Sequence, residues 1–251
     1  MVAAIAAFGV LGAIVGSFLS VVIHRLPARE SLVRPRSRCP ACLASVAPRD
    51  NVPVLSWMAL RGRCRSCGEP IPIRYPAIEA LTAAVFTGIA AARGVDSDLA
   101  LLLPFAAVLI AVAAIDLEHR IVPNRIVAPA ALWALAAGAL LRGPELPELA
   151  LAGALAFCGL LLAALAYPAG MGMGDVKLAG VMGLYLGAAV APALLAAFFV
   201  GSVLGIALIA RDGAAARKRG VPFAPFLAVG GIVGVLFGHQ LVDLYVAALL
   251  S

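Results

Sequence analysis

Long apolar runs, each close to the length that crosses a lipid bilayer, dominate this chain of 251 residues. Hydrophobic residues make up 63% of the chain and charged residues 13%, whereas an average soluble domain is about 45–50% apolar and about 25% charged. A membrane-spanning helix needs about 20 mainly apolar residues. Alanine and leucine fill these runs, which favours lipid-facing helices over barrel strands that alternate polar and apolar residues. The composition also excludes a disordered chain and a nucleic-acid-binding domain.

The pattern predicts an all-α polytopic membrane protein with about eight transmembrane helices embedded in the lipid bilayer. The first run is too long for the core of a signal peptide and lacks a basic segment before it, so we expect an uncleaved anchor. Its small residues Gly9, Gly12 and Gly16 would let a neighbouring helix approach closely. The expected helices cover residues 2–23, 77–92, 99–116, 126–141, 149–167, 175–187, 191–210 and 225–249.

The basic residues predict how the chain is oriented in the membrane. With eight helices, 17 of the 19 Lys and Arg residues fall on one side, and only Arg93 and Arg142 fall on the other. Cytoplasmic loops carry the excess of Lys and Arg, so the large loop at 24–76 is expected in the cytoplasm and both termini outside. We therefore predict three parts: a first helix at 1–23, the cytoplasmic loop at 24–76, and a seven-helix membrane domain at 77–251.

Four of the five cysteines form two C-x-x-C pairs in the large loop, Cys39 with Cys42 and Cys64 with Cys67. Each pair offers two thiolates from one tight turn, and four thiolates bind Zn²⁺ tetrahedrally without leaving an open position. The spacing therefore predicts a structural zinc in a small cytoplasmic domain. A redox pair and four unliganded thiols are the alternatives. The many arginines of this loop are interpreted as solvated charges that set the topology and attract anionic lipids.

Two carboxylates at helix ends are candidates for catalysis, because ionisable groups in membrane helices are costly. Asp116 ends the third expected helix and Asp175 opens the sixth, so both lie at the cytoplasmic boundary. Two close carboxyl groups do not both ionise easily, and such a pair provides a general acid and a general base. The alternatives are a boundary charge paired with Arg120 for Asp116 and a helix N-cap for Asp175.

The residue type at three further positions has a physical explanation. Gly172 and Gly174 precede Asp175 and would allow unusual backbone angles and the close approach of a substrate backbone. Glu79 begins the second expected helix, where a carboxylate favours the positive end of the helix dipole. That reading competes with a functional role for Glu79.

The order of several motifs resembles that of the bacterial prepilin peptidases, also called type IV leader peptidases, which are membrane aspartic proteases of the G-x-G-D type. One departure is Ala224, which stands where the family usually has glycine. The matching segments are Gly16-Ser17-Phe18-Leu19, Arg25-Leu26-Pro27, Asn51-Val52-Pro53-Val54-Leu55-Ser56-Trp57, Leu60-Arg61-Gly62-Arg63-Cys64, Arg74-Tyr75-Pro76 with Glu79, Asp116-Leu117, Ile121-Val122-Pro123-Asn124, Gly172-Met173-Gly174-Asp175-Val176-Lys177-Leu178 and Pro222-Phe223-Ala224-Pro225-Phe226-Leu227.

The resemblance implies that Asp116 and Asp175 are the catalytic dyad, supported by Gly172, Gly174 and Lys177 in the active-site loop. It implies a bacterial inner-membrane endopeptidase that cleaves the basic leader from type IV prepilins or type II secretion pseudopilins. Many members then methylate the new N-terminal residue with S-adenosylmethionine, and the four-Cys loop is typical of those members. Glu79 and the large loop are the candidates for contacts in methyl transfer.

Two other functions use the same features. A proton-coupled transporter would use the carboxylates as a relay, but it is expected to place them near the bilayer midplane rather than at one edge. A non-catalytic assembly factor of pili or secretion systems would use the zinc loop for docking. The sequence assigns neither the particular precursor, nor the pilus or secretion pathway, nor an oligomeric state.

Overall fold

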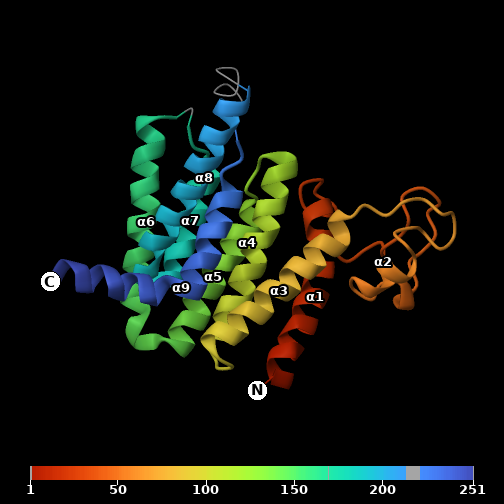
Figure 1. The fold of residues 1–251 in the computed structure, drawn as a ribbon, viewed down its shortest axis with the longest axis horizontal. Helices are drawn as coiled ribbons and strands as arrows, with labels where there is room; N and C mark the ends of the chain where they lie inside the picture. Colours follow the sequence, from red (N-terminus) through yellow and green to blue (C-terminus); the bar gives the residue numbers. More distant parts are fainter. Residues whose placement is uncertain (1, 169, 213–220, 251) are drawn as a thin grey trace. The chain divides into compact units, whose positions relative to one another are not determined.

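The computed structural model describes residues 2–168, 170–212 and 221–250 (Figure 1). Within these ranges the regular elements are helices, and the β-type pairing is limited to two isolated bridges, Arg38 with Ser45 and Arg63 with Pro70. The chain divides into two compact units, Met1–Val95 and Asp96–Ser251. Arg217, Lys218 and Arg219, which contribute to the predicted orientation, lie outside the described residues.

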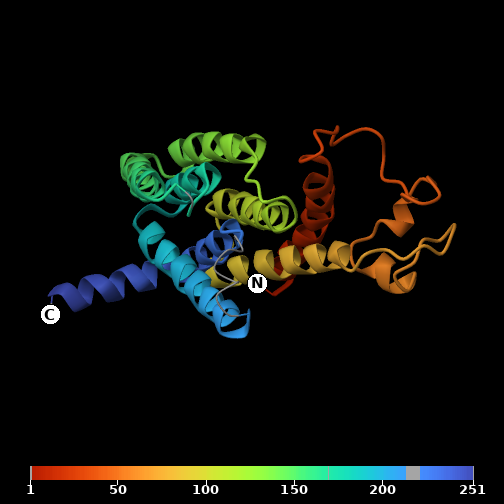
Figure 2. The same ribbon diagram turned by 90° about the horizontal axis from the view of Figure 1, so that it is seen from above.

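The first unit is a crossed pair of long helices with a loop between them. It contains α1 (Val2–Arg25), the 3₁₀ turn η1 (Pro48–Asp50), the short α2 (Leu55–Ala59) and α3 (Arg74–Arg93). Figure 2 shows α1 crossing α3, and the two helices pack against each other. Three glycines of α1 face α3, as the sequence predicts: a Cβ at Gly12 would lie 2.6 Å from the Thr82 carbonyl oxygen, and one at Gly16 would lie 2.7 Å from Cα of Glu79. The backbones therefore meet without side chains between them.

We expect Gly12→Ala to weaken the packing of α1 on α3. The added Cβ meets the backbone of α3, and overpacking of this kind costs about 1–3 kcal/mol. Gly88→Ala on α3 is the matched control, because a Cβ there meets nothing within 4 Å. Thermal unfolding in detergent should show a lower midpoint for Gly12→Ala only, and equal midpoints for the two variants would contradict this account.

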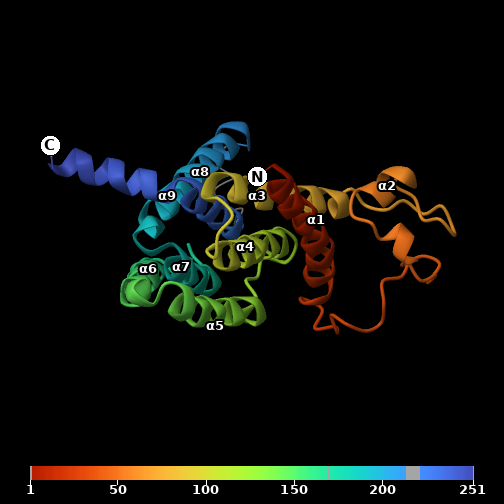
Figure 3. The ribbon, with the colours of Figure 1, turned by 90° about the horizontal axis from the view of Figure 1, so that it is seen from below.

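The second unit is a helical bundle around α7. Its helices are α4 (Leu99–His119), α5 (Asn124–Leu141), α6 (Leu146–Ala166), α7 (Met173–Leu186), α8 (Val190–Asp212) and α9 (Ala224–Leu250), with 3₁₀ turns η2 (Gly143–Glu145) and η3 (Gly187–Ala189). Figure 3 shows α4 to α7 as neighbours, and α7 contacts α5, α6 and α9. Since α7 is surrounded, its sequence is apolar on nearly every side, and Val176, Leu178, Ala179 and Met182 are fully buried.

The eight long helices of the described residues confirm the predicted helical membrane fold. By length and composition, six stretches of the described part of the chain qualify as membrane spans, with α7, η3 and α8 counted as one stretch of 40 residues. Helix α7 itself has 14 residues, about 21 Å of helix, which is shorter than a hydrocarbon core of about 30 Å. It ends where Gly187 takes a positive φ of 57°. The three-part division at residues 23 and 76 stays a prediction.

A polar cluster joins three helices of the second unit at the end remote from residue 116. Arg142 donates to both carboxylate oxygens of Asp98, at 2.6 and 3.1 Å, and to the Tyr185 carbonyl at 3.4 Å. The Tyr185 hydroxyl donates to the Ala130 carbonyl at 2.8 Å, and its ring stacks on Phe105. A bidentate pair of low exposure holds the helices more firmly than a surface ion pair does. Arg142, expected only as one of two charges on its side of the membrane, thus also fixes α4, α5 and α7 together.

Candidate active site and metal centre

Two buried aspartates occupy helix ends within the second unit. Asp116 lies three residues before the end of α4, and α4 stops because Arg120 turns to a φ of 55° with its N–H bonded to the Asp116 carbonyl. Asp175 is the third residue of α7, which begins after the extended Gly172. Their exposed fractions are only 5% and 8%. The fold thus brings two residues 59 positions apart into one buried environment.

The two carboxyl groups lie close enough for the charge of Asp116 to act on Asp175. Asp116 Oδ2 accepts a hydrogen bond of 3.1 Å from the backbone N–H of Ala224, the first residue of α9. The charge of Arg120 also acts on Asp116. Asp175 Oδ1 is buried and has no hydrogen-bond partner among the described residues. Since buried polar atoms are normally paired, an unpaired carboxyl oxygen beside a second carboxyl group is typical of a catalytic site.

The alternative reading of Asp175 as an N-cap is wrong. The N-cap of α7 is Gly172, whose carbonyl accepts the N–H of Asp175 at 3.1 Å, and no side-chain cap is formed. Asp175 instead sits in the first turn, where the helix dipole favours a negative charge. The alternative for Asp116 is supported only in that Arg120 acts on it electrostatically, because the hydrogen bond described for its side chain comes from Ala224.

The expectation that Gly172 and Gly174 adopt unusual backbone angles is wrong. Gly172 has an ordinary extended conformation (φ −78°, ψ 147°), and Gly174 lies inside α7. Gly174 is required for space, because a Cβ there would lie 2.6 Å from Cβ of Val122 in the segment between α4 and α5. At Gly172 the nearest atom to a Cβ is Asp175 Oδ2, at 3.4 Å. The glycine at 174 therefore lets the start of α7 approach the end of α4.

We expect Gly174→Ala to reduce the peptide cleavage that the resemblance implies more than Gly172→Ala does. The Cβ at 174 pushes the start of α7 away from Val122 and thereby separates Asp175 from Asp116, and small misplacements of reacting groups cost about a hundredfold in rate. Removing the opposing Cβ with Val122→Gly should restore part of the activity in the double variant. Cleavage rates of a peptide or protein substrate would check this order, and equal losses for the two glycines would contradict the space argument.

Lys177 connects the first turn of α7 to the start of α5. Its Nζ donates to Asn124 Oδ1 at 3.1 Å. Both residues line an open groove of about 490 Å³ between α5, α6 and α7, whose other lining residues are apolar or small. This hydrogen bond joins Lys177, two residues after Asp175, to the start of α5, and the role of Lys177 as a support of the active site stays a prediction.

The four cysteines of the large loop meet in one cluster in the first unit. The sulfur atoms of Cys39, Cys42, Cys64 and Cys67 all lie within 4.8 Å of one another. Cys39 Sγ and Cys67 Sγ are 3.8 Å apart, which is the separation that tetrahedral zinc with bonds of about 2.3 Å requires. The donor set and its geometry fit a structural zinc ion, as the spacing predicts.

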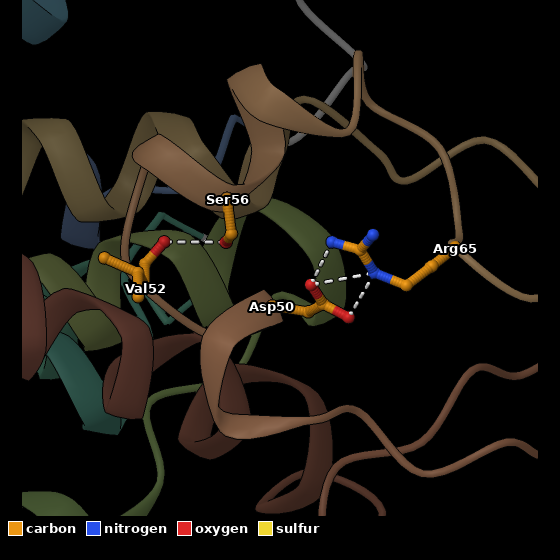
Figure 4. A network of polar contacts seen from close by, with 4 residues as sticks. All are labelled: Asp50, Val52, Ser56 and Arg65. Atoms are coloured by element: carbon orange, nitrogen blue, oxygen red, sulfur yellow. Dashed lines mark hydrogen bonds and ion pairs between the residues drawn. The ribbon is translucent and has the colours of Figure 1, made fainter.

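Two matching backbone turns build this cluster. In the first, the Leu43 N–H bonds to the Cys39 carbonyl, and in the second the Gly68 N–H bonds to the Cys64 carbonyl, both at 2.9 Å. Leu43 and Gly68 both have positive φ, 60° and 75°. Asp50 accepts three hydrogen bonds of 2.6–3.1 Å from Arg65 and so links η1 to the second turn, as Figure 4 shows together with the Ser56–Val52 bond. The hydrogen bond from Arg65 lowers the pKa of Asp50.

The thiols of the cluster and the backbone N–H groups near them change the pKa values of Cys64 and Cys67. Backbone N–H groups of Cys67 and Ser66 lower the pKa of Cys64 to about 7. The pKa of Cys67 is raised to about 12, because desolvation and the neighbouring thiols together outweigh the hydrogen bond from the Glu69 backbone. Four adjacent thiols do not all ionise alone, whereas a metal ion among them favours four thiolates.

Glu79 lies inside α3 rather than at its start, because the helix begins at Arg74. The interpretation as a helix-start charge is therefore wrong. Its exposed fraction is 9%, and its Oε2 accepts a hydrogen bond of 2.7 Å from the N–H of Val54. Val54 precedes α2 and has a φ of 61°, which is uncommon for a β-branched residue. Glu79 thus holds the turn into α2 against α3.

Two backbone donors were missed from the sequence: the N–H of Ala224, which bonds to Asp116 in the second unit, and the N–H of Val54, which bonds to Glu79 in the first unit. Backbone donors leave no residue-type signal, and both lie far along the chain from the carboxylates that they contact. The signal that could have pointed to them is that Ala224 and Val54 each lie in a segment that resembles the prepilin peptidases, Pro222–Leu227 and Asn51–Trp57.

Comparisons with known proteins cover both units. Residues 10–92 match the bacterial peptidase A24 N-terminal domain, and residues 103–210 match the type IV leader peptidase family. A prepilin leader peptidase/N-methyltransferase of Bacillus subtilis is 35% identical over 94% of this chain and 96% of its own length. One of Aeromonas hydrophila is 37% identical over 92% of this chain and 90% of its own length. No solved structure matches the chain.

Proposed function

Because the chain belongs to the type IV leader peptidase family, we propose that it removes the leader from prepilin-like precursors and then methylates the new N-terminus. The observation that carries the proposal is the pair of buried carboxyl groups, Asp116 on α4 and Asp175 on α7. The proposed substrates are type IV prepilins or type II secretion pseudopilins. A transporter or a non-catalytic assembly factor is not favoured by the names of the relatives.

The proposed cleavage is a general acid–base hydrolysis. Asp116 accepts a hydrogen bond from the backbone N–H of Ala224 at the start of α9. This bond stabilises the ionised carboxylate, so Asp116 is the proposed base. It takes a proton from water as the water oxygen attacks the scissile carbonyl carbon. Asp175, whose Oδ1 has no donor, holds the proton that passes to the carbonyl oxygen. The C–N bond then breaks, the amine takes a proton, and the leader leaves with the new carboxyl group.

The proposed second step methylates the amine that cleavage frees. When bound, S-adenosylmethionine would supply the methyl group: the S–CH₃ bond breaks as the N–CH₃ bond forms, S-adenosylhomocysteine leaves, and the amine releases a proton. Glu79 is a proposed contributor to this step, because its carboxylate accepts the hydrogen bond from the Val54 N–H and so positions the loop before α2. The cysteine cluster takes no part in bond making, since four thiolates around zinc leave no open position.

The proposed location is the bacterial inner membrane, with both termini outside and with the cysteine cluster and the aspartates on the cytoplasmic side. The distribution of 17 of 19 basic residues supports this orientation. A scissile bond at the start of an apolar helix would then lie at the depth of the two aspartates.

The test is to reconstitute the purified protein in liposomes with a prepilin, with and without S-adenosylmethionine, and to read the intact mass of the pilin. We expect loss of the leader in both samples and the added mass of one methyl group only with the methyl donor. Leader loss without methylation would retain the peptidase and remove the transferase. Failure to process several well-expressed prepilins and pseudopilins would overturn the proposed function.

A further inference from the structure

The short helix α2 exposes large apolar side chains outside the long helices. Leu55 and Met58 are 65% and 62% exposed, and a spacing of three residues puts them on one face of the helix. We name these two residues the α2 face. Two large apolar side chains exposed side by side form a small apolar patch, and contiguous apolar patches with polar residues around them mark sites of interaction with proteins or membranes.

Two contacts fix the direction in which the α2 face points. Trp57, on the other side of α2, donates its Nε1–H to the Ile71 carbonyl at 3.0 Å, and its ring packs against Gly62. Val54, just before α2, donates its N–H to Glu79. Because Trp57 is turned toward the protein, Leu55 and Met58 are held outward.

The bond to Glu79 also ties the start of α2 to α3. Glu79 is the sixth residue of α3, an apolar helix that qualifies as a membrane span. At a rise of 1.5 Å per residue, its Cα lies about 7.5 Å along the axis from that of Arg74. Interfacial helices bury their apolar face about 5–10 Å deep, at the boundary of headgroups and acyl chains.

The charges around α2 suit a lipid surface. Arg61 and Arg63 follow α2 directly and are exposed. Arg74 and Tyr75 begin α3, with the guanidinium 5.1 Å from the centre of the Tyr75 ring. Basic residues and tyrosine are enriched where helices meet the headgroups, and basic clusters attract anionic lipids.

We propose that the α2 face inserts into the lipid interface at the membrane surface where α3 begins. The occupant is the boundary layer of the bilayer, with anionic headgroups near Arg61 and Arg63. The Glu79–Val54 hydrogen bond sets the depth of insertion, and the inserted helix holds the cysteine cluster at the membrane. The proposal does not depend on the proposed catalytic activity.

The test places a photoreactive diazirine amino acid at position 58 in the full chain, reconstituted with zinc in vesicles of phosphatidylglycerol and phosphatidylethanolamine. Position 43 is the matched control, since Leu43 is 61% exposed and belongs to the first cysteine turn. We expect phospholipid adducts by mass spectrometry at 58 and few or none at 43. In the position-58 protein, Glu79→Leu should lower the adduct yield, whereas Glu79→Gln, which keeps an acceptor oxygen, should preserve it.

Other outcomes would overturn the proposal. Equal lipid adducts at 58 and 43 would show that lipid reaches the loop with no preference for the α2 face, and water adducts alone at both would remove the α2 face from the lipid. Adducts from 58 to a co-reconstituted prepilin or to a second copy of the chain, without lipid adducts, would make the α2 face a protein-binding surface. Zinc content measured on each sample confirms that the substituted chains have folded.

Discussion

Asp116→Asn and Asp175→Asn are each expected to abolish leader cleavage while the protein still inserts in the membrane. Asparagine keeps the shape of the side chain but neither takes a proton from water nor delivers one to a carbonyl oxygen. General acid–base catalysis contributes about a hundred- to ten-thousandfold in rate, so residual cleavage should fall by at least that range. The mass of the pilin recovered from cells that express each variant gives the measurement.

Glu118→Gln is the matched control for this experiment. Glu118 lies two residues after Asp116, but it is exposed. Its Oε2 lies 3.9 Å from Nε2 of His119. Removing this charge should leave cleavage near the wild-type rate. An Asp116→Asn or Asp175→Asn enzyme that retained wild-type cleavage would remove that aspartate from the mechanism.

Cys39→Ala is expected to remove the bound zinc and to unfold the loop around it. Cys39 is the buried member of the cluster, and its loss leaves three thiolates that no longer close a tetrahedron. Structural zinc binding in small peptides contributes about 10–16 kcal/mol of apparent free energy, so the loop that it stabilises should lose most of its order. Zinc per chain by atomic emission and limited proteolysis of residues 26–73 would check both effects.

Cys158→Ala serves as the control for the cysteine variant. Cys158 is exposed on α6 and lies outside the cluster. The Cys158→Ala variant should have the same zinc content and the same protease resistance of the loop as the wild type. A Cys39→Ala protein with wild-type zinc content would show that the four cysteines do not form the metal site. If the loop unfolds but cleavage continues, the aspartates act independently of the cysteine cluster.

The helices and the cysteine cluster were predictable from the sequence because local patterns determine them. An apolar run of about 20 residues has few stable structures other than a membrane-spanning helix. Two C-x-x-C turns constrain four sulfurs wherever they meet. The close approach of another helix to Gly9, Gly12 and Gly16 followed in the same way, since small residues permit it, but the sequence did not identify α3 as that helix.

The contacts that complete each site were not predictable, because they join backbone atoms to distant side chains. The bond from Ala224 to Asp116 spans 108 positions, and the bond from Val54 to Glu79 spans 25. Neither donor depends on the type of residue that supplies it. The role of Gly174 was misjudged for a related reason: the sequence suggests freedom of φ, but the structure requires space against Val122.

The shortness of α7 has a consequence for access to Asp175. A helix of about 21 Å is shorter than a hydrocarbon layer of about 30 Å. Because α5, α6 and α9 pack around α7, lipid does not adapt to its length, and the missing length is filled by protein or water. Asp175 stands in the first turn of α7, so a peptide bond would reach it in a recess between helices rather than in oil.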